Sequence, residues 1–362
     1  MPWNWQLEKW PRFTCDLNQL IETEKKFLLA AGRAFAYIKT LDKENAHRII
    51  VEILSLEGIE SSKIEGEYLD RESLQSSIRA ALGLNTQHKK PKKKESDMAE
   101  LMFAIYETFD EPLTHKMLFK WHSLLFQKES HLSNIGNYRV HKEPMQIVSH
   151  KCGSKKIFFE APPSHRVRKE MDEFVKWFNQ TRTTKSILAR AAIAHIYFES
   201  IHPFEDGNGR IGRVLVEKIL SQGVGDPILI AVSQILEKRK KEYYAELQKC
   251  NYSLDANDWV QFFSQVILQA QESSLKLLHF VINKSKTLSA LSGKINGRQE
   301  KILLRIFAEG PKGFQGGLSA ENYISITKCS RATATRDLND LIEKGALQKT
   351  GSLKHTRYSL VL

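Results

Sequence analysis

The stretch from residue 202 to residue 213 carries the side chains that a reaction at a phosphate group needs. Its functional groups belong to His202, Asp206, Gly207, Asn208, Gly209, Arg210, Gly212 and Arg213. Guanidiniums grip phosphate oxygens in a fixed fork, and glycines let backbone N–H groups approach an anion. A carboxylate is a hard ligand for Mg²⁺, and histidine is the side chain whose pKa suits a general base at neutral pH. The combination predicts a site for a metal-bound polyphosphate, most simply a nucleotide.

These residues need two helices to position them. Residues 187–200 are rich in Ala, Ile and Phe, which predicts a buried helix. The glycine-containing segment that follows predicts a loop, and a second helix then begins near Arg210. Arg210 and Arg213 are three residues apart, so they share one helix face and can grip the same ligand. The segment contains neither the P-loop pattern nor the Gly-x-Gly-x-x-Gly pattern of dinucleotide sites.

The segment resembles the motif of Fic proteins, His-x-Phe-x-Asp/Glu-Gly-Asn-Gly-Arg-x-x-Arg, and matches it at every fixed position. Fic proteins are helical enzymes that mostly transfer AMP from ATP to a hydroxyl side chain of a target protein. The resemblance implies that His202 is the general base, that Phe204 is buried and anchors the loop, and that Asp206 is a Mg²⁺ ligand. It also implies that Gly207, Asn208 and Gly209 form an anion hole, with Asn208 on the α-phosphate. Arg210 would then bind the β-phosphate, and Arg213 the γ-phosphate. We also count Gly212 among the nucleotide-binding residues.

A second motif, Ser61-Ser62-Lys63-Ile64-Glu65-Gly66, resembles the inhibitory Ser/Thr-x-x-x-Glu-Gly/Asn pattern of Fic proteins that carry an inhibitory helix N-terminally. Ser61 and Glu65 are four residues apart and therefore face the same way on a helix. Gly66 predicts the helix end, where a carboxylate needs a cation. The resemblance implies that this cation is Arg213 and that the pair prevents productive binding of the γ-phosphate. An ordinary exposed helix turn is the alternative.

A β-hairpin is expected between the two motifs. Residues 136–139, Gly-Asn-Tyr-Arg, lead into two short apolar runs, 145–148 and 157–160, which a Gly-Ser-Lys turn separates. The resemblance implies a flap that orders the acceptor segment of the target as an added strand. A surface hairpin without a role is the alternative.

Two adjacent aromatic residues, Tyr243 and Tyr244, lie where related proteins close over the adenine. They could equally be core aromatics. Asn251 is a weaker candidate for the same pocket. We expect Met171, Phe174, Val175 and Phe178 to face the core from one helix, because they follow the i, i+3, i+4, i+7 spacing.

Composition indicates a soluble globular protein of two or three domains. The chain has 362 residues, of which 41% are hydrophobic and 27% charged. It has no apolar run long enough to span a membrane and no signal-peptide pattern, and its four cysteines are dispersed. We therefore expect a cytoplasmic protein with reduced thiols and no membrane partner. The net charge of +12 suits nucleic acid or an acidic protein partner.

The predicted fold is mainly α. We expect an N-terminal helical domain with the inhibitory motif (1–95), a Fic core with a small β-hairpin flap (96–270), a helical linker (271–296) and a winged helix-turn-helix (297–362). The Ile49, Ile50, Ile53 and Leu54 side chains share one helical face of the first domain. The basic run 89–94 predicts a solvated loop, with a nucleic-acid-binding arm as the alternative.

The last segment predicts three helices, 298–308, 319–327 and 330–343, followed by a hairpin of strands 346–350 and 355–360. Eleven Lys and Arg residues against six Asp and Glu residues give it a charge of +5. The basic side chains that could meet DNA phosphates are Arg331 and Arg336 on the third helix and Lys354 and Arg357 on the wing. Winged helices also mediate protein contacts, which is the alternative.

The sequence thus predicts a protein adenylyltransferase that uses Mg²⁺ and ATP, modifies a target protein or itself, and is restrained by Glu65. A homodimer is compatible with the resemblance. Two alternatives stay open: a DNA-binding regulator in which the site senses a nucleotide, and an enzyme that removes AMP, with Glu65 activating water. The sequence does not identify the target protein, the acceptor residue or a DNA operator.

Overall fold

The computed structural model describes residues 1–84, 92–126, 132–151, 154–310, 313–314 and 316–361. The fold is mainly helical, as predicted, with two small antiparallel sheets in the described part. The chain divides into two compact units. One comprises Met1–Phe35 and Ile50–Ser274, and the other comprises Ala36–Ile49 and Leu275–Leu362.

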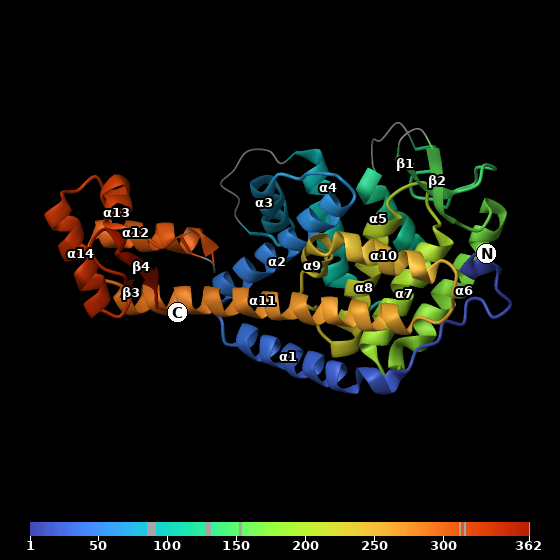
Figure 1. Cartoon of the computed structure of the whole chain (residues 1–362), viewed down its shortest axis with the longest axis horizontal. Helices are drawn as coiled ribbons and strands as arrows, with labels where there is room; N and C mark the ends of the chain where they lie inside the picture. The colour runs from blue at the N-terminus through green and yellow to red at the C-terminus, as the bar shows by residue number, and fades with distance from the viewer. Residues whose placement is uncertain (85–91, 127–131, 152–153, 311–312, 315, 362) are drawn as a thin grey trace. The chain divides into compact units, whose positions relative to one another are not determined.

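The division between the units falls inside three helices, α1 (Ile21–Lys39), α2 (Lys43–Ile64) and α11 (Asn257–Leu291). The larger unit otherwise holds, in chain order, η1 (Asn4–Gln6), η2 (Leu17–Leu20), α3 (Arg71–Ala81), α4 (Lys93–Thr108), α5 (His115–Phe126), β1 (Gln146–Lys151), β2 (Ser154–Glu160), α6 (Ser164–Gln180), η3 (Thr181–Thr183), α7 (Ile187–Ile201), α8 (Asn208–Val224), α9 (Val232–Lys238) and α10 (Lys240–Cys250) (Figure 1).

Helices α7 and α8 form the centre of the larger unit and confirm the predicted helix–loop–helix. Nearly every residue of α7 is buried, as its all-round apolar composition requires. The Ser186 side chain caps its first turn, and the carboxylate of Glu24 accepts further hydrogen bonds from Ser186 and Ile187. The partner helix α8 is likewise buried and ends at Gly225 in the left-handed region.

Helix α6 packs its predicted apolar face into the same core. Met171, Phe174 and Phe178 are fully buried, and Val175 packs beside them as a partly buried residue. On α2, the predicted apolar positions Ile49, Ile50, Ile53 and Leu54 are buried as well.

The N-terminal tryptophans support the predicted hairpin. Strands β1 and β2 pair antiparallel, with a register shift between Ile147 and Val148. The indole of Trp5 donates a hydrogen bond of 2.7 Å to the carbonyl of Glu160, and Trp3 packs edge-on against Phe159. Residue 153 of the expected turn lies outside the described residues, and Ser154 already belongs to β2.

The basic run 89–94 was predicted to be a loop throughout, and its last part is not. Residues 89–91 lie outside the described residues, but Lys92 is the N-cap of α4 and the helix begins at Lys93. Lysines have high helix propensity, so the end of the run joins the helix that follows it.

Besides the parts of α1, α2 and α11 that belong to it, the described part of the smaller unit contains three helices and a hairpin. They are α12 (Gly297–Ala308), α13 (Ala320–Thr327), α14 (Arg331–Glu343), β3 (Leu347–Thr350), the short η5 (Leu353–His355) and β4 (Arg357–Leu360). Side chains of Asn296, Ser319 and Ser330 cap the three helices. The strands pair antiparallel, and Leu318 adds one bridge to Tyr358.

The helix that leads toward this unit is continuous. Of the helical linker predicted over 271–296, residues 271–291 are part of α11, and residues 292–296 form a turn before α12. Among the described residues, no helix is both long enough and apolar enough to cross a bilayer.

Candidate functional site

The loop between α7 and α8 carries the predicted base. His202 ends α7 in the left-handed region, with φ 50° and ψ 60°, and its N–H donates to Phe198 O over 3.0 Å. A non-glycine residue there is strained unless its surroundings hold it. Phe204, two residues on, is completely buried and stacks on the His122 ring at 4.3 Å. The loop is therefore anchored on both sides of Pro203.

A buried guanidinium, that of Arg139, fastens the same loop. Its Nε donates to His202 O over 2.8 Å and its Nη2 to Ile201 O over 3.3 Å. The Arg139 backbone N–H donates to Pro203 O over 2.9 Å, and Nη1 reaches Ser164. Arg139 thus satisfies carbonyls at the end of α7 that have no partner within the helix.

The asparagine of the motif braces the loop with its side chain. Asn208 Oδ1 accepts from Phe204 N, and Asn208 Nδ2 donates to Phe204 O, each over 2.9 Å. The resemblance assigned this side chain to the α-phosphate; in the structure both of its polar atoms already have backbone partners. The neighbouring Gly207 has φ 80°, and a Cβ there would lie 2.5 Å from Phe126 Cε2. Only glycine fits that position.

The two arginines of the motif are buried and already paired. Arg213 Nη2 lies 2.8 Å from Glu65 Oε1, and Arg213 also donates from Nε to Ser61 Oγ over 2.9 Å. Arg210 Nη1 lies 2.6 Å from Glu67 Oε2, and its guanidinium sits 4.8 Å above the Phe126 ring centre. The predicted contact of Glu65 with Arg213 is therefore present in the structure, and Ser61, predicted to face the same way as Glu65, contacts Arg213 as well.

The end of α2 explains how two carboxylates reach two arginines. Gly66 has φ 83°, its N–H donates to Lys63 O, and the N–H of Glu67 donates to Ser62 O, each over 3.0 Å. This pair of bonds is the Schellman arrangement, in which the residues on either side of the left-handed glycine project from the helix end. Here those residues are Glu65 and Glu67.

Electrostatics hold the Glu65–Arg213 pair in its ionised form. Burial opposes ionisation of Glu65, but the charge and hydrogen bond of Arg213, with Arg210 and Lys240 nearby, outweigh it and lower the pKa of Glu65. Burial likewise opposes the charge on Arg213, and the Glu65 carboxylate reverses the effect and raises the pKa of Arg213. Both pKa shifts favour the ionised form of the pair.

The protonation state of His202 suits a base. Burial, with the nearby charge of Arg139, lowers its pKa to about 4, so the imidazole is neutral at pH 7. Its Nδ1 lies 3.3 Å from the carbonyl oxygen of Glu199, which can only accept, so Nδ1 carries the proton. The other nitrogen, Nε2, is left free to take a proton.

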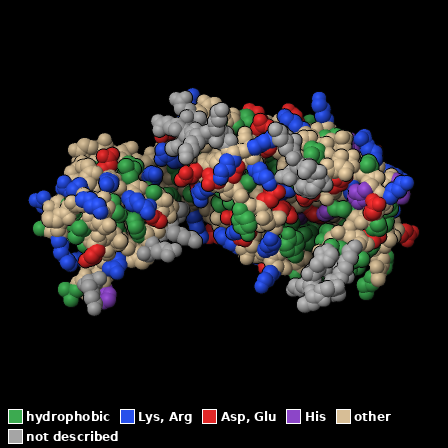
Figure 2. Space-filling view, turned by 90° about the horizontal axis from the view of Figure 1, so that it is seen from above, with side chains coloured by type: hydrophobic (Ala, Val, Ile, Leu, Met, Phe, Trp, Pro, Cys, Tyr) green, Lys and Arg blue, Asp and Glu red, His purple; other side chains and the backbone are tan. Residues whose placement is uncertain are grey.

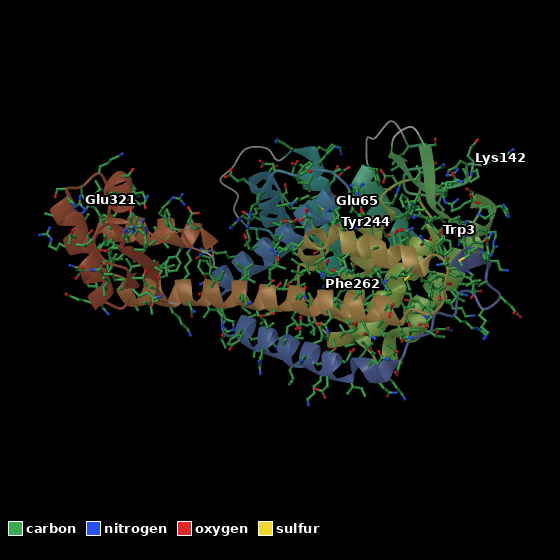
Figure 3. The ribbon with its side chains drawn as sticks, viewed as in Figure 1. Trp3, Glu65, Lys142, Tyr244, Phe262 and Glu321 are labelled. Atoms are coloured by element: carbon green, nitrogen blue, oxygen red, sulfur yellow. The ribbon has the colours of Figure 1, made fainter. Side chains whose placement is uncertain are left out.

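A pocket of about 680 Å³ opens at this loop, with His202 among its lining residues. Its described lining comes from the end of α2, the hairpin, the α7–α8 loop and α10, and includes Glu65, Ile147, Phe158, Glu199, His202, Asp206, Gly207, Asn208, Gly209, Tyr244 and Asn251. Figure 3 labels Glu65 and Tyr244, which face this pocket from α2 and α10. Arg210, Gly212 and Arg213 are absent from this described lining, because Glu65 and Glu67 cover the arginines.

The glycines at the start of α8 permit close approaches. A Cβ at Gly209 would overlap Glu65 Oε1, and a Cβ at Gly212 would lie 3.0 Å from both Glu199 Oε1 and His195 Nδ1. Gly209 thus lets a negatively charged oxygen reach the first turn of α8, where backbone N–H groups have no partner within the helix. Gly212 faces α7 and allows the two helices to pack closely.

The two tyrosines have different environments. Tyr243 also lines the pocket, but it is only 2% exposed, and its hydroxyl lies 2.8 Å from His195 Nε2. Tyr244 is 44% exposed on the pocket side. Asn251 also lines the pocket and donates to Phe158 O over 3.1 Å, which ties the base of the hairpin to α10.

The donor set for a metal is small. No cluster of three or more His, Cys, Asp or Glu side chains suited to a metal occurs in the part of the chain that the structure describes. Asp206 is exposed and lines the pocket beside the first turn of α8. One carboxylate fits Mg²⁺, which binds through one or two carboxylates together with substrate phosphates and water.

Three residues with direct contacts to the site were given no role from the sequence. Arg139 was noted within a matching tetrapeptide, but its hydrogen bonds to the loop depend on tertiary structure. Glu67 follows Glu65 by two residues, and Glu199 precedes His202 by three, one helical turn. These short spacings from Glu65 and His202 are the sequence signals that point to Glu67 and Glu199.

Comparison with known families gives two matches. Residues 112–220 match a family model described as the Fic/DOC family, and residues 3–84 match one described as a domain of unknown function (DUF4172). Together these spans include both motifs.

Curated relatives are similar over parts of the chain. A protein adenylyltransferase of Caenorhabditis elegans is 28% identical over 147 residues, which cover 40% of this chain and 27% of that protein. A probable protein adenylyltransferase of Aquifex aeolicus is 40% identical over 62 residues, covering 17% and 19%. The chain therefore spans less than a third of the length of either relative.

Solved structures show the same fold. A Fic family protein from Desulfovibrio desulfuricans superposes with a TM-score of 0.54 at 22% identity, over 97% of this chain and 98% of that one. Fic-1 from C. elegans superposes with a TM-score of 0.50 at 20% identity, over 75% of each chain.

Proposed function

We propose that this chain, in which residues 112–220 form a Fic/DOC family domain, is a protein adenylyltransferase restrained by its own Glu65. It transfers AMP from Mg-ATP to a hydroxyl side chain of a target protein or of itself. The observation that carries the proposal is the placement of a neutral His202 at a pocket that also contains the first turn of α8. A base and an anion-binding helix start are the two parts that phosphoryl transfer needs most.

The chemistry follows from this arrangement. His202 Nε2 takes the proton of the target's hydroxyl group while the hydroxyl oxygen forms a bond to the α-phosphorus of ATP. The bond from that phosphorus to the β-phosphate oxygen breaks, and pyrophosphate leaves. The N–H groups at the start of α8 stabilise the charge on the α-phosphate, since they point at the anion before the reaction begins. Mg²⁺, held by Asp206, would neutralise phosphate charge when bound.

The two arginines bind the rest of the triphosphate. In this assignment Arg210 takes the β-phosphate and Arg213 the γ-phosphate, each through charge-assisted hydrogen bonds. Both guanidiniums now hold carboxylates, so ATP must displace Glu65 and Glu67 to bind productively. The consequence is autoinhibition, because the two carboxylates occupy the guanidiniums that the phosphates would bind.

The hairpin supplies the place for the target. Ile147 and Ile157, 42% and 41% exposed, lie on paired strands whose neighbours line the pocket. An extended acceptor segment added along β1 would gain main-chain hydrogen bonds and lie close to His202. Tyr244 lines the same pocket from α10 and is assigned to the adenine, together with Asn251, which lies beside the hairpin at Phe158.

The first prediction concerns Glu65. Wild-type protein and Glu65→Gly are incubated with α-labelled ATP and Mg²⁺, and label on protein is measured. We expect strong labelling only in the variant, because Arg213 is then free for the γ-phosphate. Adding His202→Ala to the variant should reduce labelling by about 10²-fold or more while ATP still binds.

Two results would oppose the proposal. Undiminished labelling after removal of His202 would exclude it as the base. Absence of label in all variants, with the fold intact, would favour AMP removal or nucleotide sensing instead.

The second prediction concerns Glu67, the partner of Arg210. In the Glu65→Gly background, Glu67→Gln should lower KM for ATP about two- to fivefold, since a partly exposed ion pair is worth up to about 1 kcal/mol. Glu72→Gln, on the exposed start of α3, is the matched control and should leave KM unchanged. An identical KM in the Glu67 and Glu72 variants would show that Glu67 does not compete with the nucleotide.

A second candidate function belongs to the smaller unit. We propose that α12–α14 with the β3–β4 hairpin form a winged helix-turn-helix that binds DNA. Arg331 and Arg336 are exposed on α14, and Lys349 is exposed on β3. Figure 2 shows that Lys and Arg outnumber Asp and Glu on the visible face of this unit. Such a surface favours phosphate contacts.

The third prediction tests this candidate by fluorescence anisotropy of a labelled random-sequence duplex with the full chain. We expect binding that weakens as salt rises. Arg331→Ala with Arg336→Ala should reduce the slope of log affinity against log salt by about 2, one unit for each phosphate contact. Lys301→Ala, exposed on α12, should leave the slope unchanged. If the chain does not bind the duplex, or if binding does not depend on salt, the proposal is wrong and protein contacts are the alternative role of this unit.

A further inference from the structure

Helix α7 presents three titratable side chains toward the site, one above another. They are His195, Glu199 and His202, spaced by four and three residues, so they share one helical face. All three are largely withdrawn from solvent: His195 is fully buried, and the Glu199 and His202 side chains are 15% and 13% exposed. The proposed function uses only the last of them.

Glu199 lies against the nitrogen of His202 that faces away from the reaction. His202 Nδ1 is 3.3 Å from the backbone oxygen of Glu199 and 3.7 Å from its carboxyl Oε2. The backbone oxygen is within hydrogen-bond distance of Nδ1, and the carboxyl oxygen lies just beyond it. A base that is itself oriented by a third group is the recurring arrangement in proton-transfer sites, because the partner selects the tautomer and steadies the ring.

The other carboxyl oxygen of Glu199 has no hydrogen-bond partner in the described part of the chain, although it is buried. The same holds for His195 Nδ1, and both atoms lie 3.0 Å from the point where a Cβ at Gly212 would stand. Burying a carboxyl group without full hydrogen bonding costs free energy, so its presence beside the base calls for a role. Glu199 also lines the pocket.

We infer that Glu199 is a positioning residue for His202 in the proposed transfer reaction. Its carbonyl oxygen accepts from Nδ1–H and its carboxyl group lies beside the same nitrogen, so the proton stays on Nδ1 and Nε2 is left unprotonated for the acceptor hydroxyl. When Nε2 takes the hydroxyl proton, the imidazole becomes an imidazolium, and the adjacent carboxylate stabilises that charge. The inference rests on the proposed function and adds to it the group that prepares the base.

The charge of Glu199 depends on its neighbours. The groups that face it are Glu65 from α2, Arg213 from α8, His195 and His202 from α7, and Tyr243 and Tyr244 from α10. Burial and the negative charge of Glu65 raise the pKa of Glu199 to about 8, and Arg213 opposes them. An acid with a raised pKa ionises only as pH rises through that value. Removing Glu65 removes one cause of the rise.

The test uses the Glu65→Gly protein, in which labelling can be measured. Adding Glu199→Gln should lower kcat for AMP transfer about 10²-fold, at the low end of the range for acid–base catalysis, and change the affinity for ATP less than twofold. The increase of kcat with pH that ionisation of Glu199 produces in the parent should disappear. Glu199→Asp, which keeps the negative charge, should retain part of the parental kcat and part of its increase with pH.

The matched control is Glu217→Gln. Glu217 is another buried carboxyl group, and its pKa is raised by burial and by Glu57, but it does not line the pocket. Its loss should leave the pH profile unchanged. If Glu199→Gln transfers AMP at the parental rate with the parental pH profile, Glu199 does not position the base. A parent that fails to label overturns the proposed function instead.

A second measurement tests the inference if the Glu199→Gln protein does not fold. The ¹⁵N shifts of His202 in the Glu65→Gly protein report which ring nitrogen is protonated. We expect the proton on Nδ1 at pH 7. A proton on Nε2 would overturn the inference, because the base would then point its hydrogen at the acceptor.

Discussion

The need of a buried guanidinium for a negative partner governs the site. Arg213 has 2% of its side chain exposed and cannot lose its proton, so an anion must lie beside it. Removing one partner of a buried ion pair costs about 3–5 kcal/mol, and the figure is toward the lower end here because Glu65 is 30% exposed. A carboxylate and a γ-phosphate are two solutions to the same requirement. In the proposed function, inhibition and substrate binding therefore exclude each other.

The surrounding structure places the Glu65–Arg213 ion pair at the proposed nucleotide site. The left-handed Gly66 ends α2 so that Glu65 and Glu67 both project toward α8. Gly209 leaves room for the Glu65 oxygen at the first turn of α8. Arg139 fastens the end of α7. The proposed base and the proposed phosphate ligands thus belong to one pair of helices, α7 and α8, while the inhibitory group comes from a third, α2.

Local sequence signals were sufficient for much of this arrangement. Apolar composition predicted α7, the spacing of Arg210 and Arg213 predicted their shared helix, and the glycines predicted the loop between. The contact of Glu65 with Arg213 was expected only from the resemblance of residues 61–66 to the inhibitory motif of Fic proteins. Contacts between distant segments were not readable: Arg139 acts on a loop more than sixty positions away, and Glu67 meets Arg210 across the core. The side chain of Asn208 is committed to Phe204 by the fold of the loop, which residue type alone does not reveal.

The most direct test is the position of the γ-phosphate. Crystal structures of the Mg-ATP complexes of His202→Ala and of His202→Ala with Glu65→Gly would locate it without turnover. We expect a γ-phosphate oxygen within about 3 Å of the Arg213 guanidinium only when Glu65 is removed. With Glu65 present, Arg213 should keep its carboxylate and the γ-phosphate should lie elsewhere. A γ-phosphate bound to Arg213 while Glu65 stays docked would contradict the central role of this ion pair.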